Sequence, residues 1–346
     1  MNILKFLIVI SLIPLWTFGQ KDKESVCTNL LSAEQAVANY MDMHIADFQQ
    51  APDLWEQSLY KPLRNYVQKV IESTNNTELH FVYIGAGRQT PLFDDPIFVD
   101  FFRSRVSRVT LIDISKSEAL LAVNKGKGII PEIIWSGPLI ADVTGGAAQK
   151  FIEISDEINL LTDNLNLKEL FNKLGNFQFK SLLPNFSVAG LPNADIIYSE
   201  MVATFTGTPT IMALQNHYQS QLNKMSDLQK SNGQIMLDKQ SIEVWQVYND
   251  LAYLSQMRSM GSVLKPNGII AVATDTIKVY NDPNIIAQNS FTNGFPIDPN
   301  FNNISIGSDA NLWWIDEAHT GKVKEGIKSL EPHKHKVELR TYQRRY

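Results

Sequence analysis

Two glycines stand where one short apolar segment ends, and an acidic residue ends the next such segment. Residues 79–84 are mostly apolar and run into Gly85 and Gly87, a pattern typical of a buried parallel strand followed by a tight turn. Glycine lets the backbone of such a turn approach a ligand closely, and the helix that follows offers free N–H groups. Asp113 follows the apolar residues 108–112, where a carboxylate can accept hydrogen bonds from both hydroxyls of a ribose. Each feature also has a local explanation: a turn without a ligand, and a cap on the next helix.

A second acidic residue, Glu200, ends the apolar segment 194–199. A carboxylate in that place can orient or deprotonate an amine or hydroxyl nucleophile, and Tyr198 could assist it. With equal weight, Glu200 could cap the next helix or bind a ligand without doing chemistry.

Histidines give no support for a metal centre. His217 falls on an expected helix, where a lone histidine is more often packed than catalytic. His333 and His335 alternate with other residues as on one polar face of an edge strand, and no metal-site spacing accompanies them. We therefore expect no metal.

The elements that must position these residues alternate between two periodicities. Apolar residues at helical spacing over 32–73 predict two or three helices before the first strand. Further strands are expected, with helical patterns between them, at 108–112, at 132–135 or 138–141, at 194–198 and at 268–273. Leucines at helical spacing over 157–174 indicate that the long connection from Asp142 to Asp195 is a helical insertion. The alternation predicts an α/β fold with a mostly parallel, doubly wound sheet. We expect the strand that ends at Ile84 at its centre, and Gly85, Asp113, Asp142 and Glu200 along one carboxyl edge and in one crevice.

At this point the chain resembles the class I, Rossmann-like S-adenosylmethionine (SAM) dependent methyltransferase superfamily. The resemblance covers roughly residues 79–274, and the order of its motifs is more specific than any one of them. The motifs are V-Y-I-G-A-G at 82–87, L-I-D-I-S at 111–115, A-D-V at 141–143, N-A-D-I-I-Y-S-E at 193–200 and M-G-S-V-L-K-P-N-G at 260–268.

The resemblance implies SAM as the cofactor and assigns a role to several residues. Gly85 and Gly87 would line its methionine and ribose, Asp113 would hold the ribose hydroxyls, and Asp142 would meet the adenine amine. Arg88 would face the methionine carboxylate as a charge-assisted donor. Three features depart from the family pattern: the third glycine of the turn is missing, Tyr83 replaces an acidic residue, and the interval from Gly87 to Asp113 is long.

Three functions follow from these observations. The first is methyl transfer to a small or exposed nucleophile, with Glu200 and Tyr198 as the candidate catalytic residues. The second is transfer of an aminocarboxypropyl or aminopropyl group, as in enzymes similar to nicotianamine synthases and polyamine synthases. The third is an exported binding module on the same fold that has lost catalysis. The sequence favours methyl transfer and does not reveal the acceptor.

Composition and the N-terminal segment limit the classes to which the protein can belong. The 346 residues carry a net charge of −5. The segment after residue 318 holds eight Lys/Arg and three Glu, so the part of the chain before it is strongly acidic. Nucleic acid is therefore not an expected partner, whereas a small-molecule substrate is. Lys5 and the apolar run 6–16 resemble an export signal, which predicts a periplasmic, secreted or membrane-anchored protein. Membrane contact is expected only through that segment if it stays uncleaved.

The expected organisation has four parts. Residues 1–19 form the signal or anchor, and 28–78 an N-terminal helical segment. The SAM-binding core spans 79–280, with the helical insertion at 150–185. A C-terminal extension with edge strands covers 281–346. The single cysteine, Cys27, excludes an internal disulfide.

Overall fold

The computed structural model describes residues 52–85, 91–200, 202, 208–280, 288–304, 311–315 and 333–345. The export signal expected at residues 1–19 lies outside these ranges, as do Cys27, Gly87 and Arg88. Within them, no helix combines the length and the apolar character that crossing a membrane requires.

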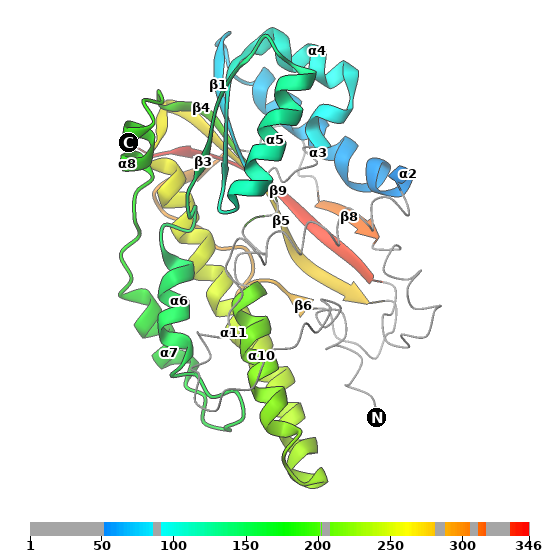
Figure 1. Ribbon diagram of the computed structural model, residues 1–346, viewed down its shortest axis with the longest axis vertical. Helices are drawn as coiled ribbons and strands as arrows, with labels where there is room; N and C mark the ends of the chain where they lie inside the picture. Colours follow the sequence, from blue (N-terminus) through cyan, green and yellow to red (C-terminus); the bar gives the residue numbers. More distant parts are fainter. Residues whose placement is uncertain are drawn as a thin grey trace.

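Helices and strands alternate along the described chain (Figure 1). The strands are β1 (Leu79–Ile84), β2 (Val106–Asp113), β3 (Ile134–Ile140), β4 (Ala194–Glu200), β5 (Leu264–Tyr280), β6 (Gln288–Asn289), β7 (Phe301–Asn303), β8 (Asn311–Ile315) and β9 (His333–Arg344). The helices are α2 (Pro52–Trp55), η3 (Glu56–Tyr60), α3 (Lys61–Glu72), η4 (Pro91–Asp94), α4 (Pro96–Arg105), α5 (Lys116–Ile129), α6 (Ala147–Ser155), α7 (Leu167–Gly175), α8 (Leu183–Val188), α10 (Thr208–Leu222) and α11 (Asp227–Gly261).

The sheet has the strand order β3-β2-β1-β4-β5-β9-β7, with β6 paired to β5 and β8 to β9. Strands β1 to β5 are parallel, and β1 is the middle one of these five. This order is that of a doubly wound Rossmann sheet. The predicted fold class is thus confirmed, and so is the central place of the strand that ends at Ile84.

Helices cover both faces of the sheet, and successive residues of β1 point to opposite faces. Phe81 and Tyr83 pack in one core with side chains of α3, α4 and α5, including Phe102. Val82 and Ile84 pack in a second core with side chains of α8 and α11. Burial on both sides explains why β1 is a nearly continuous apolar run rather than an alternating one.

The connection from β3 to β4 contains α6, α7 and α8, but the helix expected over residues 157–174 begins only at Leu167. The Asn159 side chain accepts a hydrogen bond from the backbone N–H of Leu161, which favours a turn over a helix there. Asn166 then caps α7 by accepting from the N–H of Glu169 at 3.1 Å. The expected helix was therefore too long at its N-terminal end.

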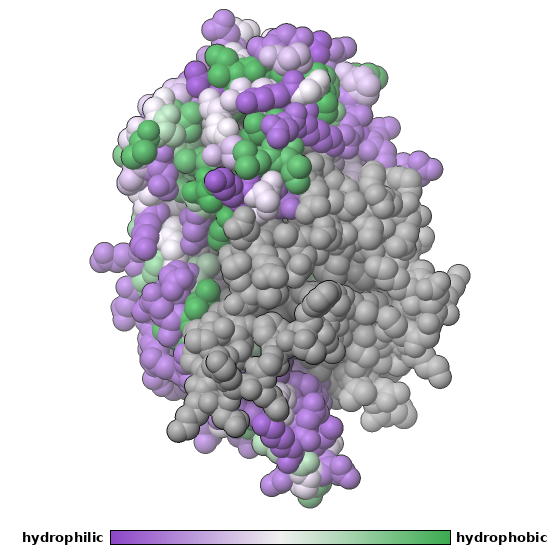
Figure 2. Space-filling view, viewed as in Figure 1, coloured by the Kyte–Doolittle hydropathy of each residue, from purple (hydrophilic) through white to green (hydrophobic). Residues whose placement is uncertain are grey.

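Helix α11 is 35 residues long, roughly 52 Å at 1.5 Å per residue. Its C-terminal half packs on the sheet, and its other half pairs with α10 beyond the sheet (Figure 1). The end of this hairpin is mainly hydrophilic (Figure 2). Helices α6, α7, α10 and α11 share a third apolar core of their own.

Strand β9 is not the edge strand that the polar alternation of residues 333–340 predicted. It lies antiparallel between β5 on one side and β7 and β8 on the other. Its alternate residues contribute to both cores, with Val337 in the first and Tyr342 in the second. Pairing with β9 also extends β5 to Tyr280, well past the predicted 268–273.

Helix α5 packs against β3 through a contact that leaves no room for a methyl group. A Cβ at Gly126 would stand 2.1 Å from Cη2 of Trp135, which is itself buried. A Cβ at Gly128, two residues along the same helix, would meet nothing within 4 Å.

We expect Gly126→Ala to destabilise the protein and Gly128→Ala to leave it unchanged or slightly more stable. Alanine gains up to about 1 kcal/mol of helix propensity at either site. At Gly126 overpacking against Trp135 costs about 1–3 kcal/mol, which outweighs that gain. Urea unfolding of both variants measures the difference. Equal stability of the two variants would contradict this account of the α5–β3 contact.

Candidate functional site

Four of the predicted site residues lie at the carboxyl ends of neighbouring strands. Along this edge of the sheet come Asp142 just after β3, Asp113 at the end of β2, Gly85 just after β1 and Glu200 at the end of β4. The backbone N–H of Gly85 donates to the carbonyl of Ile112 at 3.3 Å, which ties the ends of β1 and β2 together. The prediction that these residues share one carboxyl edge is confirmed.

The chain changes direction at this edge between β1 and β4. The connection after β1 runs through α4 to β2, on the face that holds the first core. The connection after β4 runs through α10 and α11 to β5, and α11 covers the opposite face. Ligands of open α/β sheets bind at such a switch point, outside the carboxyl ends of the strands.

Gly85 occupies a position that no other residue fills without strain. Its φ is +74°, and a Cβ there would stand 2.2 Å from Cγ2 of Val202 and 3.0 Å from the carbonyl oxygen of Glu200. The end of β1 therefore lies directly against the end of β4. Only glycine permits both the left-handed conformation and this close approach.

Asp113 is not the cap of the helix that follows it. Its Oδ1 accepts from the N–H of Ser115 at 2.9 Å, while the Ser115 hydroxyl caps α5 by accepting from the N–H of Glu118. Burial raises the pKa of Asp113 to about 6, against hydrogen bonds from the backbone of residues 114 and 115 that lower it. The capping explanation thus belongs to Ser115, and Asp113 is a half-buried carboxyl without that role.

Asp142 has a local role that the sequence pattern did not reveal. Its Oδ1 accepts from the N–H of Thr144 at 2.9 Å, and its Oδ2 accepts from the N–H of Gly146 at 3.2 Å. Gly146 is the residue that precedes α6. Asp142 therefore holds the turn between β3 and α6, and its contact with an adenine amine stays a prediction.

Glu200 is a partly accessible carboxyl bound to a buried phenol. The hydroxyl of Tyr83 donates to its Oε2 at 2.6 Å. Burial raises the pKa of Glu200 to about 7, although the Tyr83 and Tyr198 hydroxyls and the charge of Arg64 lower it. A carboxyl group with a pKa near 7 exists in both protonation states at neutral pH, which is what acid–base catalysis requires.

Tyr83 rather than Tyr198 makes the close contact with Glu200, and the sequence analysis missed it. The two tyrosines are partners in the parallel pairing of β1 with β4, and their ring centroids are 5.4 Å apart. The Tyr198 hydroxyl is buried and has no hydrogen-bond partner of ordinary geometry among the described residues. The signal was available, because residues 83, 198 and 200 must share one face when the strands pair in this register.

Arg64 is a second residue that the sequence analysis missed. This side chain of α3 is 3% exposed, and its guanidinium donates to the carbonyl of Pro91 at 3.1 Å and to the carboxylate of Glu56. Its Nε lies 3.6 Å from Oδ2 of Asp95. The cation thereby ties α3 to η4 and the start of α4, directly after the glycine turn. An arginine between Leu63 and Val67 on an otherwise apolar helix face was the available signal.

A cavity of about 260 Å³ lies elsewhere in the described structure. It is lined by residues of β2 and β3 and of the segment after α8, namely Arg108, Ser136, Gly137, Pro138, Leu139, Ala189, Gly190 and Leu191. None of the four edge residues lines it. That one crevice contains all four stays a prediction.

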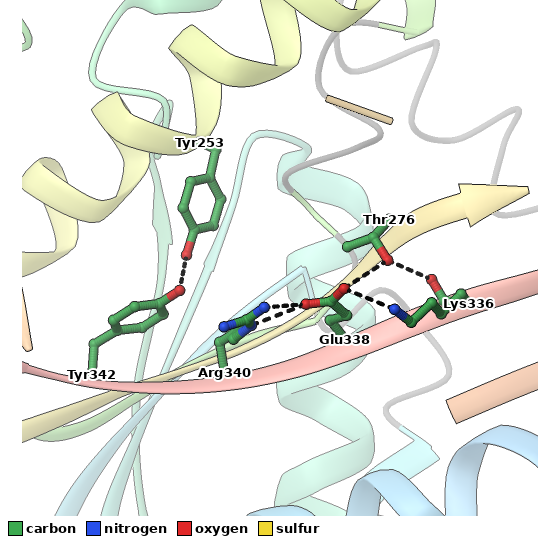
Figure 3. A network of polar contacts seen from close by, with 6 residues as sticks. All are labelled: Tyr253, Thr276, Lys336, Glu338, Arg340 and Tyr342. Atoms are coloured by element: carbon green, nitrogen blue, oxygen red, sulfur yellow. Dashed lines mark hydrogen bonds and ion pairs between the residues drawn. The ribbon is translucent and has the colours of Figure 1, made fainter. Parts of the chain in front are cut away.

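The polar residues of β9 form a network on the α11 side of the sheet (Figure 3). The carboxylate of Glu338 binds Arg340 and Lys336 and also accepts from the hydroxyl of Thr276. The burial of Glu338 opposes ionisation, but these partners lower its pKa overall. The polar face of this strand is therefore satisfied by ion pairs and hydrogen bonds within the ribbon of β5 and β9.

The histidines of the sequence analysis stand on other elements than the edge residues. His217 is on α10, where its ring packs against that of Tyr218 and meets the amide of Gln221. His333 and His335 are on β9, opposite Tyr280 and Lys278 of β5. Across the described ranges, no group of three His, Cys, Asp or Glu side chains is arranged to hold a metal ion.

No sequence model of a protein family matches the chain, and no curated protein is significantly similar to it. Among solved structures, two SAM-dependent methyltransferases in complex with S-adenosyl-L-homocysteine are each 8% identical to it. The one from Thiobacillus denitrificans has a TM-score of 0.33 over 82% of this chain and 90% of its own. The one from Geobacter sulfurreducens has a TM-score of 0.34 over 83% and 90%.

The [4+2]-cyclase SpnF is 9% identical, with a TM-score of 0.33 over 84% of this chain and 83% of its own. TM-scores at this level carry no functional argument. The strand order and the geometry of the carboxyl edge are the basis for the function proposed below.

Proposed function

We propose that the protein is a SAM-dependent methyltransferase that acts on a small molecule with an exposed amine or hydroxyl nucleophile. The observation that carries this proposal is the arrangement at the switch point of the sheet. A glycine that tolerates no side chain stands there between a half-buried carboxyl without a capping role, Asp113, and a carboxyl that titrates near neutral pH, Glu200.

The residues at this edge fit the cofactor. Gly85 lets the turn after β1 adopt a left-handed conformation directly beside the end of β4. Asp113 would hold the ribose hydroxyls from the adjacent strand, and Asp142 would meet the adenine amine. Gly87 and Arg88 would complete the site around the methionine part. When bound, SAM supplies an electrophilic methyl group on its sulfonium.

Glu200 would act on the acceptor rather than on the cofactor. Its carboxylate would take the proton that the amine or hydroxyl nucleophile loses on methylation, and Tyr83 would hold one of its oxygens meanwhile. Positioning of the nucleophile would contribute the remainder of the rate enhancement.

Product analysis tests the reaction class. Incubation with SAM and a panel of small amines and alcohols, followed by mass spectrometry, should yield S-adenosylhomocysteine and a methylated acceptor. Methylthioadenosine instead would show that a different carbon of SAM is transferred. Absence of SAM binding in calorimetry would favour a binding module that has lost catalysis.

We also propose that residues 1–19 direct export, which would leave Gln20 at the mature N-terminus or keep the protein anchored in a membrane. The motivation is the apolar run after Lys5. Cell fractionation with mass spectrometry of the N-terminus tests it. A soluble cytoplasmic protein with Met1 intact would rule it out.

Asp113→Ala should weaken SAM binding at least about 10-fold, because hydrogen bonds to a charged group contribute about 1.5–3 kcal/mol each. Ser115→Ala is the matched control, since it removes the α5 cap two residues away. It should cost about 1 kcal/mol of stability and leave the affinity for SAM nearly unchanged. Calorimetric titration and thermal melting of both variants separate the two roles. Unchanged affinity in Asp113→Ala would remove the ribose assignment.

The pH dependence of SAM binding follows from the same carboxyl. Only ionised Asp113 accepts hydrogen bonds from both hydroxyls, and its pKa is about 6 in the protein. The affinity should therefore fall as the pH drops below about 6 in the native protein. In Asp113→Ala this fall should be absent, which calorimetry between pH 5 and pH 8 would measure.

Glu200→Gln should reduce turnover about 10²- to 10⁴-fold and yet stabilise the fold at alkaline pH. The carboxyl ionises near pH 4.5 in the unfolded chain and near pH 7 in the folded protein. The unfolded state therefore holds fewer protons in this window, and the stability of the native protein falls as the pH rises through it. The neutral amide avoids this cost and still accepts a hydrogen bond from Tyr83.

Thermal melting of the native protein and Glu200→Gln checks the expectation. The variant should melt higher above pH 7, and its advantage should vanish near pH 4.5. A variant that melts lower at every pH would show that the carboxylate stabilises the fold.

A further inference from the structure

The contact between Tyr83 and Glu200 joins the strand that carries the glycine turn to the strand that carries the candidate base. Tyr83 lies two residues before Gly85 on β1, and Glu200 ends β4. The Tyr83 hydroxyl donates to Oε2 of Glu200 at 2.6 Å, a short bond of the kind that an ionised acceptor forms.

Packing fixes the Tyr83 ring. The side chain is 0% exposed, and its ring lies edge-on to those of Phe81 and Phe93, at centroid distances of 6.3 Å and 6.4 Å. Burial and the nearby Glu200 carboxyl raise the pKa of Tyr83 well above its usual range. The phenol therefore keeps its proton at working pH and always presents a donor to Glu200.

The groups that face Glu200 come from each element packed around it. Tyr83 stands on β1, Tyr198 on β4 and Arg64 on α3. The Arg64 guanidinium is bonded to Glu56 and lies near Asp95, so two carboxylates already balance its charge. Tyr60 of η3 lies beyond, near enough to raise the pKa of Tyr83. Among these groups only Tyr83 donates a hydrogen bond of ordinary geometry to Glu200.

We propose that Tyr83 is the positioning residue of the active site, whose hydroxyl holds Oε2 of Glu200 and leaves Oε1 to accept a proton from an amine or hydroxyl acceptor. This role rests on the proposed methyl transfer. It narrows the acceptor to a nucleophile that must lose a proton on methylation. A nucleophile that carries no such proton would have no use for a carboxylate held in this way. It also gives a physical reason for a tyrosine at the position where the resembling family often has an acid.

Tyr83→Phe tests the proposal, with Tyr198→Phe as the matched control. Both changes remove one hydroxyl from neighbouring buried rings and keep the ring itself. Loss of the Tyr83 donor should raise the pKa of Glu200 by about one to two units, because a hydrogen bond to the ionised form lowers the pKa of an acid. Loss of the Tyr198 hydroxyl should raise it by less than half as much.

The readout is the titration of the Glu200 carboxyl, followed by ¹³C NMR of protein labelled at the glutamate side-chain carboxyl. The Glu200 signal is the one missing in Glu200→Gln. Once an acceptor is identified, the acidic limb of the pH–rate profile of Tyr83→Phe should shift to higher pH together with the pKa of Glu200. Turnover of this variant should recover at higher pH.

An unchanged pKa of Glu200 in Tyr83→Phe, or an equal shift of that pKa in Tyr198→Phe, would overturn the positioning role. If Tyr83→Phe then only lowered the melting temperature, Tyr83 would have a structural role alone. The NMR titration needs neither cofactor nor acceptor. A shifted pKa in a protein that does not bind SAM would therefore refute the methyltransferase proposal and leave the Tyr83–Glu200 contact established.

Discussion

The parallel pairing of β1 with β4 is the constraint on which the candidate site depends. This register sets Tyr83 beside Tyr198 and Ile84 beside Ser199, so that the two strands end together. The chain beyond β1 must then turn within reach of the Glu200 carbonyl, which only a glycine permits. A shift of one residue in this pairing would place Tyr83 on the opposite face from Tyr198 and Glu200, and so separate the phenol from the carboxyl. The glycine, the phenol and the carboxyl are thus three consequences of one strand alignment.

Desolvation raises the pKa of the two carboxyls at this edge, and the same desolvation makes their ionised forms unfavourable to the stability of the fold. Asp113 and Glu200 both have their pKa raised by burial, to about 6 and about 7. Neither carboxyl is neutralised by a direct ion pair among the described residues, since the nearby Arg64 is held by Glu56 and Asp95. Partly desolvated carboxyls of this kind are costly to a fold, and they are common where a protein binds or transforms a ligand.

The sequence was sufficient for the parts of the molecule that follow from local pattern. Short, nearly continuous apolar runs and the residues that end them predicted the parallel strands, the central place of β1 and the shared edge of Gly85, Asp113 and Glu200. The helix N-cap at Ser115 could have been recognised too, because a serine two residues after a strand and just before a helix is a strong capping signal.

Features that depend on pairing between distant segments could not be predicted in this way. The alternation of β9 has the same appearance in an edge strand and in a strand between two others, and only its neighbours decide. The bond from Tyr83 to Glu200 joins residues 117 positions apart. Arg64 shows as an exception in an apolar helix face, but its partners are known only once η3, η4 and α4 are in place.

The interior position of β9 has a consequence for the order of events during biosynthesis. Its partner β5 ends at Tyr280, and about 50 residues separate that end from His333. Until those residues have left the ribosome, the outer edge of β5 over Ile269–Tyr280 has no β9 to pair with. An unpaired edge of an apolar strand is a template for association with other chains. The sheet would thus close only in a late step, when β9 pairs with this edge of β5.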